Sequence, residues 1–177
     1  MSSETVLASE RVYEGRILNL RVDQIRTPNG VEALREIVEN GSAVAIVALD
    51  DQQRVVLIKQ YRHAIRGQVI EIPAGKLDGD EEPLEGAQRE LREETGFQAG
   101  HFERLGSFYP APAWSTEFVN LYLATQLNPG PTHLEADEAI EMWQVALDDA
   151  VKMIQSGTIV DGKTVAALLL AQQYLQS

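Results

Sequence analysis

Short segments rich in β-favouring apolar residues, each broken by polar positions, fill the N-terminal part of the chain. They span residues 6–15, 17–27 and 31–39, and Pro28-Asn29-Gly30 supplies a turn between the last two. Asn and Gly tolerate the left-handed backbone conformations that tight turns between antiparallel strands require. The pattern predicts a small antiparallel β lobe over residues 1–41.

The next stretch has a different pattern, because residues 42–49 and 54–60 are nearly continuous apolar runs rich in Val and Ile. The polar turn 50–53 joins them, and residues 68–72 continue in the same style. Continuous apolar runs of this length are typical of strands that are buried on both faces. Further strands are expected at residues 104–109, 118–124 and 142–145.

Helices are expected in three places. Residues 83–95 begin with Pro83, which suits a first helical turn, and Gly96 lies where a C-terminal capping residue belongs. Two more helices are expected at residues 147–155 and 163–175. Strands with helices placed around them predict an α/β or α+β layered domain over residues 42–177.

Composition narrows the class of protein. With 44% apolar and 24% charged residues and no apolar run of bilayer length, the chain is typical of a globular protein without a membrane span. Its start lacks the basic and apolar regions of a secretory signal, so a cytoplasmic location is expected. The absence of cysteine excludes disulfides and thiol catalysis. A formal net charge of −12 disfavours a nucleic-acid partner, because nucleic-acid backbones are bound by clustered Lys and Arg.

The helix at residues 83–95 carries a candidate metal site. Leu84, Ala87 and Leu91 form one apolar stripe, while Glu90, Glu93 and Glu94 share a contiguous arc beside it. Carboxylates this close repel one another, and near a helix C-terminus they also oppose the helix dipole. A hard divalent cation would relieve both penalties. The competing interpretation is an ordinary solvated acidic helix.

The surroundings of these glutamates favour the metal site, since the segment resembles the Nudix box G-x5-E-x7-R-E-U-x-E-E-x-G-U, where U is apolar. The matching positions are Gly75, Glu81, Arg89, Glu90, Leu91, Glu93, Glu94, Gly96 and Phe97. The resemblance implies an α/β/α sandwich with a mixed sheet and Mg²⁺ or Mn²⁺ held by Glu90, Glu93, Glu94 and the carbonyl of Ala74. It also implies that Arg89 orients the box carboxylates and that Glu81 holds the loop.

Flanking segments are similar to the ADP-ribose pyrophosphatase and nucleoside diphosphate sugar hydrolase subfamily. They are residues 35–39, 60–62, 71–75 and 109–112. This similarity implies that Arg35, Arg62, Glu71 and Glu117 bind the substrate. It further implies a homodimer in which the lobe of residues 1–41 is exchanged between subunits. For Trp114 two roles are open: stacking on a base of the substrate, or packing within its own loop.

Relatives of this type take the general base from an acidic loop after the box, here residues 133–141. Glu138 matches best, with Glu135 or a box glutamate, Glu93 or Glu94, as alternatives, and an ordinary solvated loop is the competing interpretation. The predicted reaction is hydrolysis of the pyrophosphate of ADP-ribose or a related nucleoside diphosphate sugar. The alternative substrates are GDP-mannose and NADH. The alternative to an enzyme is a module that senses a nucleotide sugar without cutting it.

Overall fold

The computed structural model describes residues 3–134 and 139–177, and these residues divide into two compact units. One unit comprises residues 1–42 together with the loop Tyr109–Phe118, and the other comprises residues 43–108 and 119–177. No helix in the described part of the chain is long and apolar enough to span a bilayer.

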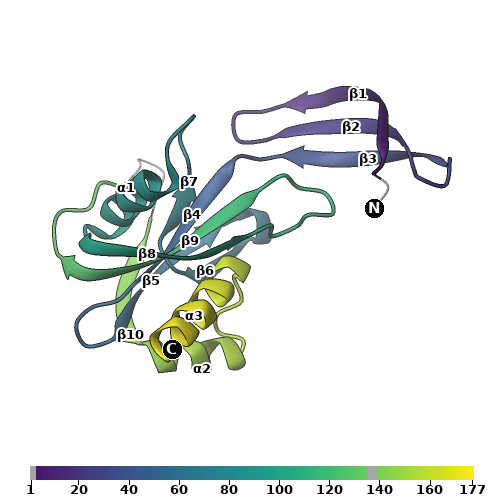
Figure 1. Ribbon diagram of the computed structural model, residues 1–177. Helices are drawn as coiled ribbons and strands as arrows, with labels where there is room; N and C mark the ends of the chain where they lie inside the picture. The colour runs from purple at the N-terminus through teal and green to yellow at the C-terminus, as the bar shows by residue number, and fades with distance from the viewer. Residues whose placement is uncertain (1–2, 135–138) are drawn as a thin grey trace. The chain divides into compact units, whose positions relative to one another are not determined.

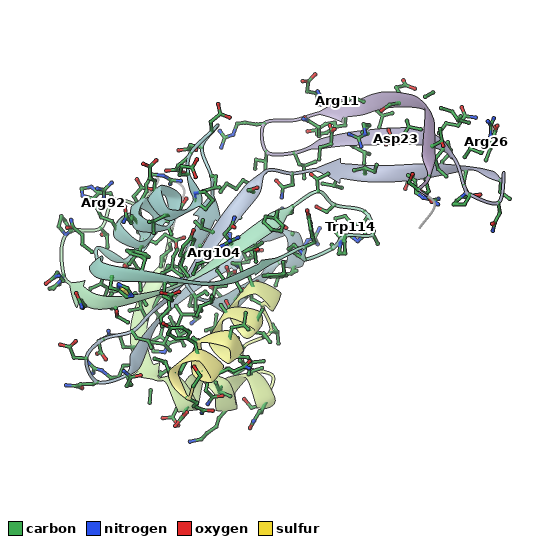
Figure 2. The ribbon with its side chains drawn as sticks, viewed as in Figure 1. Arg11, Asp23, Arg26, Arg92, Arg104 and Trp114 are labelled. Atoms are coloured by element: carbon green, nitrogen blue, oxygen red, sulfur yellow. The ribbon has the colours of Figure 1, made fainter. Side chains whose placement is uncertain are left out.

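The first unit is built on a three-stranded antiparallel sheet in the order β1-β2-β3. Its strands are β1 (Thr5–Glu14), β2 (Asn19–Arg26) and β3 (Glu32–Glu39). Polar side chains lock their register: Asp23 on β2 accepts from Ser9 Oγ at 2.6 Å, and Arg21 pairs with Glu39 on β3 at 2.6 Å. Figure 2 labels Asp23 within this sheet. The antiparallel lobe expected from the sequence is therefore present, although β1 is exposed along its whole length.

The loop Tyr109–Phe118 is attached to the end of β3 within the same unit. The Val38 N–H donates to the Trp114 carbonyl at 2.7 Å, and the Thr116 N–H donates to the Val38 carbonyl at 3.1 Å. The rings of Tyr109 and Phe118 close the base of the loop, with centroids 4.7 Å apart. The loop therefore continues the backbone pairing of the sheet.

The second unit contains two sheets, in the orders β10-β5-β6 and β7-β4-β9-β8. Their strands are β4 (Ser42–Ala48), β5 (Arg54–Arg62), β6 (Gly67–Glu71), β7 (Ala74–Lys76), β8 (Gln98–Phe108), β9 (Phe118–Asn128) and β10 (Glu141–Ala146). The described registers, β4 with β7, β5 with β6, β5 with β10 and β8 with β9, are all antiparallel. The helices are η1 (His63–Ile65), α1 (Pro83–Thr95), α2 (Leu147–Gln155) and α3 (Gly162–Leu175).

Strand β4 explains the layering of this unit. Side chains alternate across a strand, so Ala45, Val47 and Leu49 enter one core with α2 and α3. Val44, Ile46 and Ala48 enter a second core, with Ala87 and Leu91 of α1. Figure 1 shows α1 on one side of these strands and α2 and α3 on the other. The continuous apolar run thus lies in the middle of an α/β/α sandwich, as predicted.

Several boundaries differ from the sequence prediction. Helix α1 has the predicted limits, and Gly96 ends it with φ 73° while its N–H donates to the Arg92 carbonyl at 2.8 Å. Strand β8, however, begins at Gln98 rather than Arg104, and β9 continues to Asn128. These extensions mix polar residues with Ala99, Phe102 and Leu127, which pack against the second core, and cross-strand backbone pairing joins the two strands along them. The short strand β7 was not predicted.

Candidate active site

A polar pocket of about 410 Å³ lies in the second unit beside α1. Strand β5, strand β7 and the C-terminal half of α1 supply most of its wall. The lining residues are Gln60, Arg62, Ala74, Gly75, Lys76, Asp78, Arg89, Glu90, Glu93, Glu94 and His133. The fold therefore brings together the three predicted metal ligands, the Ala74 backbone and two of the predicted site arginines.

The three glutamates differ in their environments. Glu94 is only 5% exposed, and its Oε2 accepts from the Ala74 N–H at 2.9 Å, which joins α1 to β7. Glu90 and Glu93 are less buried, and both accept from Nη1 of Arg89, at 2.7 and 3.1 Å. Burial of Ala87 and Leu91 explains this placement, because it turns the carboxylate arc toward β7. Leu84, the third residue of the predicted stripe, is 43% exposed, so the prediction was wrong for this residue in the first turn of the helix.

Arg89 is the central cation of the box. Its Nε and Nη2 donate to Glu81 at 2.9 and 2.8 Å, and Nη2 also donates to the Lys76 carbonyl at 2.9 Å. The hydrogen bonds to Glu81 are the largest cause of the raised pKa of Arg89, and Glu90 and Glu93 add to them. The same pairing lowers the pKa of Glu81. Arg89 thus fixes the loop after β7 to the helix.

Gly75 leaves the space that Glu90 occupies. A Cβ at position 75 would lie 2.0 Å from Oε1 of Glu90, so only glycine allows this carboxylate to rest against the β7 backbone. Three carboxylates on one pocket wall beside the Ala74 backbone offer oxygen donors of the kind that a hard divalent cation prefers. In the described part of the chain, no three His, Cys, Asp or Glu side chains converge as a metal-holding group. Glu90 and Glu93 instead share Arg89.

Arg62 stands at the end of β5 and is paired with Glu71 of β6. Its Nε and Nη2 donate to the two carboxylate oxygens at 2.7 and 2.6 Å, and Lys163 of α3 reaches Oε2 at 2.5 Å. Glu71 is 2% exposed. Burial raises its pKa, but the hydrogen bonds and charges of Arg62 and Lys163 outweigh burial, so the pKa of Glu71 is lowered. The predicted substrate residue Glu71 is thus a buried partner of Arg62.

The other predicted substrate residues lie in the first unit. Arg35 pairs with Glu4, and Glu117 accepts from the Asn40 side-chain amide at 3.2 Å. Trp114, labelled in Figure 2, is 55% exposed in the loop after β8. Glu138 and Glu135, the candidate bases, lie outside the described residues.

Two residues of interest carried no recognised signal in the sequence. Lys163 reaches a carboxylate 92 residues away, which no local pattern reveals. His133 has no metal-ligand spacing, yet it lines the pocket, and its backbone N–H donates to the Glu93 carbonyl at 2.9 Å. Pro and Gly just before His133 marked this segment only as a loop.

The chain is similar to known proteins over nearly its whole length. Residues 39–168 match the NUDIX domain model, and residues 4–38 match that of the nucleoside diphosphate sugar hydrolase N-terminal domain. The chain is 38% identical to a Bacillus subtilis protein named ADP-ribose pyrophosphatase, over 98% of this chain and 92% of that one. It is 32% identical to a Citrobacter koseri protein named GDP-mannose pyrophosphatase, over 95% of each.

A solved structure described as an ADP compounds hydrolase has the same fold. It superimposes with a TM-score of 0.91, covers 99% of this chain and 96% of its own, and is 25% identical in sequence. The family model covers most of the chain, and Gly75, Arg89, Glu90, Glu93 and Glu94 of the box line the pocket. The chain therefore belongs to the Nudix family and is a Nudix hydrolase.

Proposed function

We propose that this Nudix hydrolase acts in the cytoplasm on ADP-ribose or a closely related nucleoside diphosphate sugar, with Mg²⁺ or Mn²⁺ as cofactor. The products would be a nucleoside monophosphate and a sugar phosphate. The observation that carries the proposal is the wall of Glu90, Glu93 and Glu94 beside the Ala74 backbone in a polar pocket. Similarity to proteins named for ADP-ribose and GDP-mannose pyrophosphatase activity supports the substrate class.

The donor set fits a divalent cation, with Glu90, Glu93, Glu94 and the Ala74 carbonyl as the residues that would hold it. When bound, the cation would offset diphosphate charge and lower the pKa of the attacking water. Arg89 would keep the box loop and the helix in register, because it contacts both. Arg62, clamped by Glu71, would present a cation to the phosphates.

For the general base, we propose Glu138, with Glu135 or a box glutamate as the alternatives. A base must come within about 3 Å of the attacking water, directly or through one further water. Glu138→Gln should lower kcat by about 10²- to 10⁴-fold with a much smaller change in KM. A loss of less than about tenfold, together with a far larger loss in Glu135→Gln, would place the base elsewhere.

The substrate preference is tested by kcat/KM for ADP-ribose, GDP-mannose and NADH under the same metal. We expect ADP-ribose to be the best substrate, in line with the higher identity to the ADP-ribose pyrophosphatase. A higher kcat/KM for GDP-mannose or NADH would replace ADP-ribose as the proposed substrate, while the proposed reaction, hydrolysis of a pyrophosphate bond, would stand. Binding of these compounds without turnover would favour a sensing module, which the complete set of box glutamates argues against.

We further propose that the chain is a homodimer that exchanges the N-terminal lobe, so that Arg35 and Glu117 serve substrate binding. The match of residues 4–38 to an N-terminal domain of nucleoside diphosphate sugar hydrolases supports a dedicated role for this lobe. So does the exposure of large apolar side chains on β1, including Val6, Val12 and Tyr13, which a partner surface would cover.

A further inference from the structure

The buried carboxylate of Glu71 accepts hydrogen bonds from two cationic side chains, one of which, Arg62, lines the pocket. Oε1 of Glu71 accepts from Arg62 Nε at 2.7 Å, and Oε2 accepts from Arg62 Nη2 at 2.6 Å and from Lys163 Nζ at 2.5 Å. Such charge-assisted, two-point pairing fixes the plane of a guanidinium as well as its position. The orientation of Arg62 is therefore set by Glu71.

Lys163 is itself held by the first turn of α3. Asp161 caps this helix by accepting from the Thr164 N–H at 3.0 Å and from Thr164 Oγ1 at 2.6 Å. Lys163 Nζ lies 3.0 Å from the same Asp161 oxygen. Thr164 Oγ1 in turn accepts from the Ile72 N–H at 3.0 Å, and Thr164 is fully buried. The start of α3 is thus joined directly to the end of β6.

The other edge of the Arg62 guanidinium does not contact Glu71. Nε and Nη2 bind Glu71, whereas Nη1 has no hydrogen-bond partner among the residues that the structure describes. The side chain is 43% exposed and lines the pocket beside the box glutamates. An anchored guanidinium with a free donor edge on a polar pocket is suited to phosphate or ribose oxygens.

Lys163 helps to hold the carboxylate that orients Arg62. Because Asp161 also pairs with Lys163, the two cations face two carboxylates, and Lys163 acts on Arg62 through the hydrogen bond that it donates to Glu71 Oε2. Without Lys163, Glu71 would pair with Arg62 alone, and one carboxylate oxygen would lose a strong donor in a buried place. A Glu71 side chain that is held less firmly would fix the orientation of Arg62 less well.

We propose that Lys163 is a positioning residue for substrate binding, acting through Glu71 on Arg62. This inference rests on the proposed function only in taking a diphosphate as the ligand of Arg62. It makes the C-terminal helix a determinant of substrate affinity, although α3 contributes no residue to the wall of the pocket.

A double-mutant cycle tests this coupling. The variants are Lys163→Met, Arg62→Ala and their combination, each measured for KM and kcat with ADP-ribose and Mg²⁺. The dissociation constant of α,β-methylene-ADP, a diphosphate whose bridge is not hydrolysed, is measured by calorimetry on the same proteins. Lys152→Met is the matched control, since Lys152 pairs with Asp149 on the exposed face of α2.

We expect Lys163→Met to raise KM and the analogue's dissociation constant about tenfold in the wild-type background, with kcat nearly unchanged. In the Arg62→Ala background the same substitution should change neither by more than about twofold. Lys163→Arg, which keeps the cation, should restore most of the affinity, and the control should equal wild type. Thermal melting confirms folding, and Lys163→Gln replaces Lys163→Met if the latter does not fold.

Equal effects of Lys163→Met in both backgrounds, or no effect in the wild type, would overturn the inference. Failure of the proposed function is recognised separately, because a wild-type chain that hydrolyses no nucleoside diphosphate sugar still allows the cycle to be run on the analogue. The coupling between positions 62 and 163 is then read from the dissociation constants alone.

Discussion

Gly75→Ala should separate catalysis from stability in this chain. The added Cβ would lie 2.0 Å from Oε1 and 2.1 Å from Cδ of Glu90, whereas an ordinary contact is about 3.4 Å or longer. The carboxylate must therefore retreat by roughly 1.4 Å from the β7 backbone. Because the clash is with the end of a flexible side chain, the backbone can stay in place.

Gly75→Ala is expected to lower turnover. A displacement of about 1 Å in a reacting constellation can lower a rate about 10²-fold, so kcat/KM should fall by at least this factor. Stability should change by less than about 1 kcal/mol, since replacing glycine where its backbone is unstrained removes entropy from the unfolded state. Steady-state turnover of ADP-ribose and thermal melting measure the two quantities.

Gly41→Ala is the matched control, because a Cβ there meets nothing within 4 Å. It should leave both turnover and the melting temperature close to wild type. Near-wild-type turnover in Gly75→Ala would contradict a need for Glu90 to lie against β7. An equal loss of turnover in Gly41→Ala would show that the effect is not specific to this contact.

Three further predictions concern the metal site, acid stability and assembly. Glu93→Gln and Glu94→Gln should each lower kcat by several orders of magnitude while the melting temperature stays nearly unchanged, because an amide is a weaker ligand for a hard cation. Glu85→Gln, on the exposed first turn of α1, is the control. Near-wild-type turnover in both variants would contradict the metal-ligand role of these glutamates. The lowered pKa of Glu71 means that its pairing stabilises the fold above its ordinary pKa of 4.5, and that this contribution is lost as the pH falls through the lower folded value. Urea unfolding from pH 7 to pH 3 measures this loss of stability with acid, which should be smaller in Glu71→Gln than in the wild type. Glu71→Gln should also lower the free energy of unfolding by about 3 kcal/mol at pH 7. An unchanged loss of stability with acid in this variant would contradict the pairing. Deletion of residues 1–38 should abolish dimerisation in sedimentation and substrate binding in calorimetry, and a monomeric, fully active truncation would contradict the exchanged lobe.

The parts of the fold that local patterns determine could be predicted from the sequence. Helix α1 has its predicted limits, because Pro83 and Gly96 mark its ends, and Ala87 and Leu91 of the predicted stripe set its buried face. The run of β4 indicated burial on both faces, which the two cores confirm. The box glutamates were found through fixed spacing on that helix, and the pocket contains all three.

What the sequence did not reveal depends on contacts between distant segments. The first half of β8 sets only Ala99 and Phe102 against the core, too few apolar positions to predict a strand, and it pairs with β9 through its backbone. Glu71 lies in an apolar strand context, and its two cations come from the end of β5 and from α3. Lys163 could be connected with the site only once the fold had brought α3 to β6.

The most direct test of the central claim is the identity of the products formed from ADP-ribose. The purified chain is incubated with ADP-ribose and Mg²⁺ in ¹⁸O-labelled water, with a parallel sample in excess chelator, and the products are identified by mass spectrometry. We expect AMP and ribose 5-phosphate, one of them carrying the label, and no cleavage with chelator. Release of inorganic phosphate or free adenine, or equal cleavage in the presence of chelator, would contradict metal-dependent hydrolysis of the pyrophosphate bond.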